Sequence, residues 1–390
     1  MIEFEGDEKS ASFTETFQSR SCNLIETWKN RGSELMKLLR FERLMILVLH
    51  SGLLFFLLFH LAAVVSFVCS FGAEARSSKG GWYSRWSESR SGFRFKKGIG
   101  ATEHRKLMSG GIERDYLLYL PASATIANAP RSLVIACHGG GGTARSMDRL
   151  CGGLTALAEK KGFIVAFPEG IDRHWNDGRT VNLNNTSDVD FIATMIDALI
   201  AEGLVDRSRV YSTGISNGGF FSQYLAKKIP DKLAAVASVA ATLPEFYLKM
   251  DKTAPVPVLY ILGTEDPLVP YNGGQVGGKV LKRKRGVVLP AEDALQYWLS
   301  NNEIAQVEPT KRNLNCVDSD MSIEIREYSG GDESRDVSFY KIIGGGHTWP
   351  QGWQYLPDWL VGKTNREINA NEVIWDFFSR HQLKAAGGLE

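Results

Sequence analysis

The stretch Val210-Tyr-Ser-Thr-Gly-Ile-Ser-Asn-Gly-Gly219 decides the fold, together with the residues Phe220–Lys228 that follow it. The pattern predicts a β-branched strand, a glycine-flanked serine and an amphipathic helix. Gly214–Gly218 fits G-x-S-x-G, a strained turn that lifts the serine hydroxyl clear of a sheet and places it at a helix N-terminus. The chain has 39 glycines, so the pentapeptide alone is equally compatible with an ordinary glycine-rich turn. The flanking strand and helix favour the nucleophile elbow, and the rest of the chain must supply its partners.

The composition bounds the class of protein. The chain has 390 residues and 44% hydrophobic content, enough for one sizeable domain or two small ones. Its net charge of +1 gives no global field, so we expect no nucleic-acid partner. We interpret the short basic run Lys282–Arg285 as a solvated loop. The sequence contains no CxxC pair, no HExxH and no Walker loop, so we expect no metal and no cofactor.

An apolar segment lies near the start of the chain. Leu44–Phe71 is almost uninterrupted apolar sequence, long enough to cross a bilayer, and Ala73-Glu-Ala75 after it is an A-x-A cleavage pattern. We therefore expect a secreted or periplasmic protein, with an uncleaved membrane anchor as the alternative. Met36 begins an ordinary signal order of basic and then apolar residues, so residues 1–35 are interpreted as a mis-assigned start or a non-native extension.

These features divide the chain into five parts. We expect a polar extension at residues 1–43, a signal peptide or anchor at 44–75, a flexible linker at 76–102, a catalytic domain at 103–383 and a tail at 384–390. Among the cysteines beyond the apolar segment, Cys137, Cys151 and Cys316, at most one pair can form a disulfide.

Strands and helices alternate in the predicted catalytic domain. An initial antiparallel hairpin is expected at the Gly110-Gly111 turn before Arg114–Leu120. The alternation predicts an α/β fold with a mostly parallel sheet, helices on both faces, and a site at the carboxyl ends of the strands. The further predicted strands are Leu133–Cys137, Phe163–Phe167, Leu233–Val239, Val256–Leu262, Ile323–Tyr328 and Val337–Ile343; the further helices are Ala144–Lys160, Asp188–Ile200, Ala291–Ser300 and Asn371–His381.

Ser216 needs a histidine base, itself oriented by a carboxylate, in the chain order Ser, Asp or Glu, His. Two histidines follow the serine. His381 closes the last predicted helix, where a surface position explains it. His347 follows a predicted strand through three glycines, in a loop suited to swinging an imidazole over the sheet, and we assign it as the base.

The carboxylate should end a strand between Ser216 and His347. Val256–Leu262 leads into Gly263-Thr-Glu-Asp-Pro267, and we prefer Asp266 to its rival Glu265 because the following proline fixes its backbone. An oxyanion hole needs two preorganised N–H donors. The amide of Asn217 should supply one, and the glycine loop after His138 the other, which we place at Gly140 within one residue.

With these residues placed, the chain resembles the polyhydroxybutyrate depolymerase-like and feruloyl esterase-like family of the α/β-hydrolase superfamily. The resemblance spans about residues 104–381 and is carried by six motifs in order: His138–Thr143, Trp175–Arg179, Asp188–Ile192, Gly214–Gly219, Gly263–Gly274 and Gly344–Pro350. It implies an α/β-hydrolase fold, an exported serine esterase, and Ser216, Asp266 and His347 as the triad. The long N-terminal extension departs from the family pattern, and we find no separate polymer-binding domain.

Several points stay open in the sequence. Trp175 and Trp349 either line a substrate pocket or pack the loops, and Arg179 more simply ties down its own loop. The expected substrate is a small or oligomeric ester, such as a hydroxybutyrate oligoester or a feruloyl or acetyl ester of plant polysaccharide. The alternatives are an acyltransferase or serine peptidase on the same fold, or a catalytically dead binding module anchored through residues 44–71.

Overall fold

A computed structural model of the protein describes residues 100–123, 129–179, 187–277, 285–315, 320–331 and 333–384. The chain divides into two units, Met1–Phe93 and Arg94–Glu390, and every described residue belongs to the second. The apolar segment at residues 44–71 and residues 76–99 of the linker expected at 76–102 lie outside the described residues. The last two residues of that range, Ala101 and Thr102, begin the first described strand. None of the helices in the described part has the length and apolar character needed to span a bilayer.

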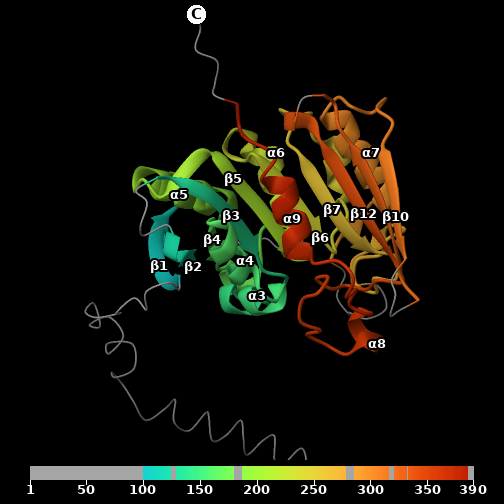
Figure 1. Ribbon diagram of the computed structural model, residues 1–390, viewed down its shortest axis with the longest axis horizontal. Helices are drawn as coiled ribbons and strands as arrows, with labels where there is room; N and C mark the ends of the chain where they lie inside the picture. The colour runs from blue at the N-terminus through green and yellow to red at the C-terminus, as the bar shows by residue number, and fades with distance from the viewer. Residues whose placement is uncertain are drawn as a thin grey trace, which may run out of the picture. The chain divides into compact units, whose positions relative to one another are not determined.

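The second unit is built on one large sheet with the strand order β1-β2-β4-β3-β5-β6-β7-β12-β11-β10 (Figure 1). The six central strands, from β4 to β12, run parallel to one another. The strands outside them pair antiparallel on both sides. The sheet confirms the predicted mostly parallel α/β architecture. The central strands are β3 (Arg131–Cys137), β4 (Ile164–Pro168), β5 (Val205–Ile215), β6 (Ala235–Val239), β7 (Val258–Gly263) and β12 (Val337–Ile343).

Antiparallel hairpins extend the sheet on each side. The predicted first hairpin is present as β1 (Ala101–Ser109) and β2 (Ile112–Leu120), with Gly110 and Gly111 in the left-handed turn between them. On the other side, β11 (Ser322–Tyr328) pairs with both β12 and β10 (Thr310–Asn315). Strand β10 was not predicted, because all six of its residues are exposed and show no apolar alternation.

Two hydrophobic cores lie on opposite faces of the sheet, because alternate residues of a strand point to opposite sides. Leu133 and Ile135 of β3 belong to the core under α5, α6 and α7, whereas Val134 belongs to the core under α3, α4 and α9. Figure 1 shows α9, α3 and α4 in front of the strands. The helices are α3 (Ala144–Cys151), α4 (Leu154–Lys161), α5 (Asp188–Ala201), α6 (Asn217–Lys228), α7 (Ala291–Asn301), the short α8 (Asp358–Val361) and α9 (Ala370–Phe378).

The predicted helix Ala144–Lys160 is in fact two helices. Gly152 and Gly153 both have positive φ, 60° and 113°, and they end α3 before α4 begins. A left-handed C-cap glycine terminates a helix because it turns the chain away while its amide donates to a carbonyl of the last turn, here that of Arg149. The apolar pattern continued through this break and concealed it.

His381 was expected on the surface at the end of the last helix, and this was wrong. Helix α9 ends at Phe378, and His381 is fully buried, with its ring 4.5 Å from that of Phe377. Its backbone carbonyl accepts a hydrogen bond from the hydroxyl of Tyr211 on β5. This hydrogen bond attaches the segment after α9 to the central sheet. This contact joins residues 170 apart in sequence, so no local pattern could reveal it.

The cysteines were expected to form at most one disulfide. Cys137 ends β3 and Cys151 ends α3, and both are buried free thiols that belong to different cores. Burial raises the pKa of both thiols. Both are therefore inert core residues. Cys316 lies outside the described residues.

Candidate active site

Ser216 stands in the strained turn between β5 and α6. Its backbone has φ 57° and ψ −119°, a region that residues with a side chain rarely adopt. The strain is held from both sides, because the Ser216 amide donates to the Val239 carbonyl and its carbonyl accepts from the Phe220 amide, each at 2.9 Å. The serine is therefore fixed at the carboxyl end of the sheet and at the N-terminus of a helix.

Close backbone packing explains the glycines around Ser216. A Cβ on Gly214 would lie 2.5 Å from the Gly218 carbonyl carbon, and a Cβ on Gly218 would overlap the Cys137 carbonyl. These two glycines have ordinary φ, so they are required by space alone. Strand β5, helix α6 and the end of β3 can approach one another because these positions carry no side chain. The geometry is that of a nucleophile elbow.

His347 and Asp266 form a buried pair at the same edge of the sheet. The Nδ1 of His347 donates to the Oδ2 of Asp266 at 2.6 Å, and the side chains are 3% and 2% exposed. The other carboxylate oxygen accepts from the amides of Leu268 and Val269 at 2.8 and 2.7 Å. Every hydrogen bond of this carboxylate stabilises its charged form. The His347 Nε2 has no hydrogen-bond partner among the described residues, so it is left to act as an acceptor.

The loop that carries His347 is tightly packed, whereas the sequence suggested a loop that could swing. A Cβ on Gly346 would overlap the Val361 carbonyl and the Gly362 backbone, and one on Gly263 would overlap the Gly345 carbonyl. The His347 amide also donates to the Val361 carbonyl. Of the three loop glycines, Gly344 has positive φ, at 77°. The other two allow close backbone contact, so the loop fixes the imidazole in place.

Asp266 rather than Glu265 contacts His347. Both follow β7, but the side chain of Glu265 is exposed, and its amide donates to the Gly345 carbonyl. The Glu265 backbone therefore connects the loop after β7 to the loop after β12, and the side chain of the next residue, Asp266, points inward. This is the geometry that the sequence favoured when it preferred Asp266.

The glycine loop after β3 runs beside the elbow. A Cβ on Gly139 would lie 3.7 Å from the Cβ of Ser216, and one on Gly140 would meet the His174 ring at 3.2 Å. The backbone amides of Gly140 and Asn217 have no hydrogen-bond partner among the described residues. Two amides without partners near a serine could receive an oxyanion. Gly139, the neighbouring residue within the predicted range, lies against the Ser216 side chain.

The side chain of Asn217 has a structural task that sequence reasoning missed. Its Oδ1 accepts from the Trp175 amide at 2.8 Å, and its Nδ2 donates to the Trp175 carbonyl at 3.1 Å and to Asp177 at 2.6 Å. Asp177 is also paired with Arg179 through two hydrogen-bonded nitrogens. Arg179 thus ties down its own loop, as the sequence suggested. The Trp-Asn-Asp-Gly-Arg motif is a buried strut that fixes the first residue of α6.

Both tryptophans singled out in the sequence are fully buried. Trp175 stacks on Phe221 at 4.9 Å and 3°, and its Nε1 donates to the His138 carbonyl. Trp349 belongs to the opposite core, and its Nε1 donates to Asn371. Neither side chain has exposed surface. The described structure therefore favours loop packing over a pocket-lining role for both residues.

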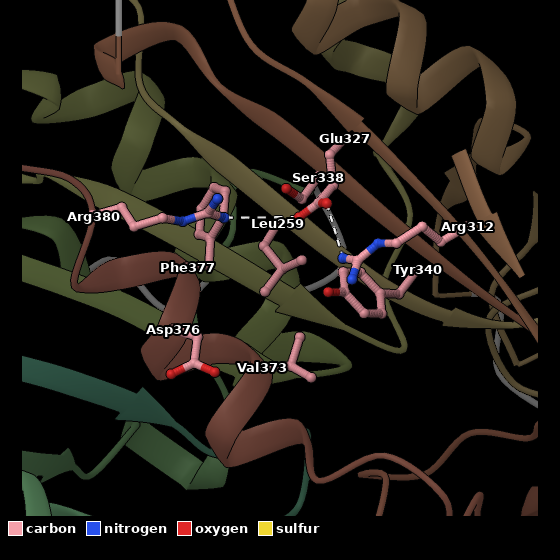
Figure 2. Close-up of a pocket in the computed structure, with 9 residues that line it drawn as sticks. All are labelled: Leu259, Arg312, Glu327, Ser338, Tyr340, Val373, Asp376, Phe377 and Arg380. Carbon is pink, nitrogen blue, oxygen red and sulfur yellow. Dashed lines mark hydrogen bonds and ion pairs between the residues drawn. The ribbon is translucent and has the colours of Figure 1, made fainter. Parts of the chain in front are cut away.

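A surface hollow in the described part lies away from this edge (Figure 2). Its lining includes Ser338 and Leu259, which are each the second residue of their parallel strands, so the hollow sits at the amino ends. The carboxylate of Glu327 lies between Arg312 and Arg380 and forms an ion pair with each of them. The hollow is lined by Leu259, Arg312, Glu327, Ser338, Tyr340, Val373, Asp376, Phe377 and Arg380. It is separate from the edge that holds Ser216. No group of metal-ligating side chains gathers within the described residues.

The parallel sheet, the elbow and the buried His–Asp pair define the α/β hydrolase class of fold. Comparison with known proteins agrees. A family model described as Phospholipase/Carboxylesterase matches residues 124–286. These matches support an esterase-like α/β hydrolase with the activity of a carboxylic ester hydrolase.

Similar proteins carry esterase names. A putative esterase, NocK, of Nocardia uniformis subsp. tsuyamanensis is 29% identical over 284 residues, which cover 71% of this chain and 82% of that protein. Feruloyl esterase B of Piromyces equi is 29% identical, with 50% of this chain and 36% of that protein covered, so the chain spans about a third of it. Acetyl xylan esterase from Aspergillus awamori has a solved structure with a TM-score of 0.48 and 16% identity, covering 72% of this chain and all of that one.

Proposed function

We propose that the protein is an exported serine esterase in which Ser216 is the nucleophile, His347 the general base and Asp266 the residue that orients it. One observation carries the proposal. The buried imidazole of His347 donates from Nδ1 to a fully hydrogen-bonded carboxylate and keeps Nε2 without a partner among the described residues. A histidine held in this tautomer is prepared to accept a proton from a serine hydroxyl.

In the acylation step, the Ser216 oxygen attacks the ester carbonyl carbon while the His347 Nε2 takes the hydroxyl proton. The developing negative charge on the carbonyl oxygen is received by the amides of Asn217 and Gly140, with the N-terminus of α6 adding its dipole. The C–O bond to the alcohol then breaks, and His347 returns its proton to the departing oxygen. An acyl group remains on Ser216.

In the deacylation step, His347 takes a proton from water as the water oxygen attacks the acyl carbonyl. The second tetrahedral intermediate uses the same two amides. When it collapses, the acid leaves and the proton returns to Ser216. Asp266 orients the imidazole and stabilises the imidazolium that forms twice in each cycle, and the amides of Leu268 and Val269 hold its carboxylate in place.

For the substrate we propose hydroxybutyrate-type oligoesters or feruloyl or acetyl esters of plant polysaccharide. The support is the set of similar proteins, which includes feruloyl esterase B of Piromyces equi and a poly(3-hydroxyalkanoate) depolymerase of Paucimonas lemoignei. Export is supported by the apolar segment Leu44–Phe71 and the A-x-A pattern after it. Full-length protein expressed in its cellular context and sequenced from its N-terminus after export tests that part: a retained segment would contradict cleavage.

The catalytic assignment is tested with Ser216→Ala. We expect kcat for p-nitrophenyl butyrate to fall by about 10⁴-fold or more, because no other group can form the acyl intermediate. The Tm should stay within a few degrees of the wild-type value, since the loss is one oxygen atom. A fluorophosphonate probe should label the wild type and leave the variant unlabelled. Wild-type protein that neither hydrolyses the ester nor takes the label would instead indicate a catalytically dead binding module.

A further inference from the structure

The last residue of the basic run Lys282–Arg285 lies beside the glycine loop. A Cβ on Gly140 would meet the Nη1 of Arg285 at 3.3 Å and the Nε2 of His174 at 3.3 Å. The run was interpreted as a solvated loop, and its first three residues lie outside the described part of the chain. Arg285 itself is partly exposed and brings its guanidinium next to the backbone whose amide we propose as an oxyanion donor.

The backbone that carries Arg285 is fixed. The Nη1 of Arg179 donates to the Arg285 carbonyl at 2.8 Å. The next carbonyl, that of Gly286, accepts from the Gln275 side chain at 2.8 Å and from the Val276 amide at 2.9 Å. Because Arg179 is itself paired with buried Asp177, the start of this segment is connected to the strut beneath Ser216. The position of Arg285 is therefore preorganised.

The guanidinium of Arg285 has no hydrogen bond or ion pair with the residues that the structure describes. The nearest carboxylate of its supporting network, Asp177, is already occupied by Arg179 and Asn217. Arg285 is partly exposed, so its five N–H donors remain available to a ligand. A planar guanidinium carried on a fixed backbone matches a carboxylate, which it can bind through two parallel hydrogen bonds.

His174, which also lies beside Gly140, follows a strained segment. Asp172 and Arg173 have φ of 51° and 63°, and they turn the chain so that His174 lies over Gly140. The Arg173 carbonyl accepts from the Gly141 amide at 2.8 Å, which ties the segment to the glycine loop. Two consecutive strained residues without glycine persist where the surrounding structure requires them, and such strain clusters at functional sites.

We propose that Arg285 is a specificity residue that binds a carboxylate carried by the ester substrate. The proposal rests on the proposed function, because the ester carbonyl would be bound by the amides of Asn217 and Gly140 while Arg285 holds the acid group. The enzyme then prefers esters with a free carboxylate a few bonds from the ester group. The carboxylate could belong to the acyl part or to the alcohol part, and the two sources require separate substrates.

The experiment uses two matched substrate pairs. The first is p-nitrophenyl hydrogen adipate with methyl p-nitrophenyl adipate, which places the acid or its neutral methyl ester on the acyl side. The second is 4-carboxyphenyl butyrate with 4-(methoxycarbonyl)phenyl butyrate, which does the same on the alcohol side. The measured quantity is the ratio of kcat/KM for the acid to that for its neutral partner, compared between the wild type and Arg285→Gln. Comparing the two enzymes cancels the intrinsic reactivity of each ester.

In at least one pair, we expect Arg285→Gln to lower this ratio by about tenfold, because one charge-assisted contact at a partly exposed site is lost. Arg285→Lys should retain part of the preference, since a lysine keeps the charge and loses the planar fork. Arg312→Gln, which removes the same charge at the amino ends of the strands, should leave both ratios unchanged. Added salt should reduce the wild-type preference and not that of Arg285→Gln.

An unchanged ratio in both pairs would overturn the proposal. So would an equal loss on acid and neutral members, which would mean that Arg285 supports the loop or the oxyanion rather than a substrate carboxylate. The neutral esters keep this outcome distinct from a failure of the proposed function. If the wild type hydrolyses none of the four esters, the esterase assignment itself fails, whereas normal turnover of the neutral esters leaves it intact.

Discussion

Two buried histidines at the carboxyl ends of the parallel strands differ in what surrounds their rings. His138 follows β3 and His347 follows β12, and each is flanked by glycines. The Nδ1 of His138 donates to the Gly139 carbonyl at 2.9 Å, and its Nε2 accepts from the Gly170 amide at 3.0 Å. Both nitrogens are therefore used. His347 uses Nδ1 on Asp266 and keeps Nε2 without a partner among the described residues.

The chemistry open to a buried histidine near a glycine loop therefore depends on whether its second ring nitrogen is already hydrogen bonded. Burial, together with the nearby His174 and Arg173, lowers the pKa of His138 to about 4, so at neutral pH it is an uncharged strut between β3 and the Gly170 turn. His347 has a carboxylate behind it that stabilises an imidazolium. The two rings share a location and a degree of burial, and the free Nε2 of His347 in the described part supports its proposed role as the general base.

Substitution of each histidine is the strongest way to break this comparison. We expect His347→Ala to lower kcat for p-nitrophenyl butyrate by about 10⁴-fold or more while the Tm changes little, because Asp266 keeps its two backbone donors. We expect His138→Asn to lower kcat by about tenfold at most and to destabilise the fold by about 1–3 kcal/mol, since the Gly170 amide loses a well-placed acceptor. Steady-state kinetics and urea unfolding measure both. The reverse ranking would assign the general base to His138.

The carboxylate behind His347 sharpens the comparison. Asp266→Asn should lower kcat by about 10³- to 10⁴-fold, because an amide can hold the ring in the wrong tautomer and cannot stabilise the imidazolium. Glu265→Gln is the matched control, one residue away on an exposed side chain, and should leave kcat and Tm unchanged. Equal effects of the two substitutions would mean that position in the loop, rather than the contact with His347, explains the loss.

The smallest expected effect concerns acid stability. The pKa of His138 is lowered from 6.5 to about 4 in the folded state. Between pH 6.5 and pH 4, His138 is therefore protonated in the unfolded chain and neutral in the folded protein. The stability contributed by neutral His138 is therefore complete above pH 6.5 and decreases below it, by about 3 kcal/mol in total. His138→Asn should remove this component. Urea unfolding at pH 7 and pH 4.5 should show a smaller acid loss for the variant, and parallel losses would contradict the assignment.

Local patterns in the sequence predicted the strand and the helix around Ser216. The β-branched strand, the glycine-flanked serine and the amphipathic helix were predicted at Val210–Lys228 and are present as the end of β5, Ser216 and α6. The preference for Asp266 over Glu265 came from the proline that follows, and the contact with His347 agrees with it. Such features are encoded within a few residues by backbone sterics and periodicity, which act on neighbours in the chain.

The sequence by itself determined the order of most strands and helices, β10 and the break between α3 and α4 excepted, and the positions of Ser216, Asp266 and His347 along the chain. The tertiary structure decided which histidine keeps a nitrogen without a partner in the described part, that Trp175 is a buried strut, and that Arg285 lies beside Gly140. The physical reason is the distance along the sequence over which each contact acts. Hydrogen-bond partners 32 and 81 residues apart meet when the sheet brings the strand ends together, and no local pattern encodes that distance.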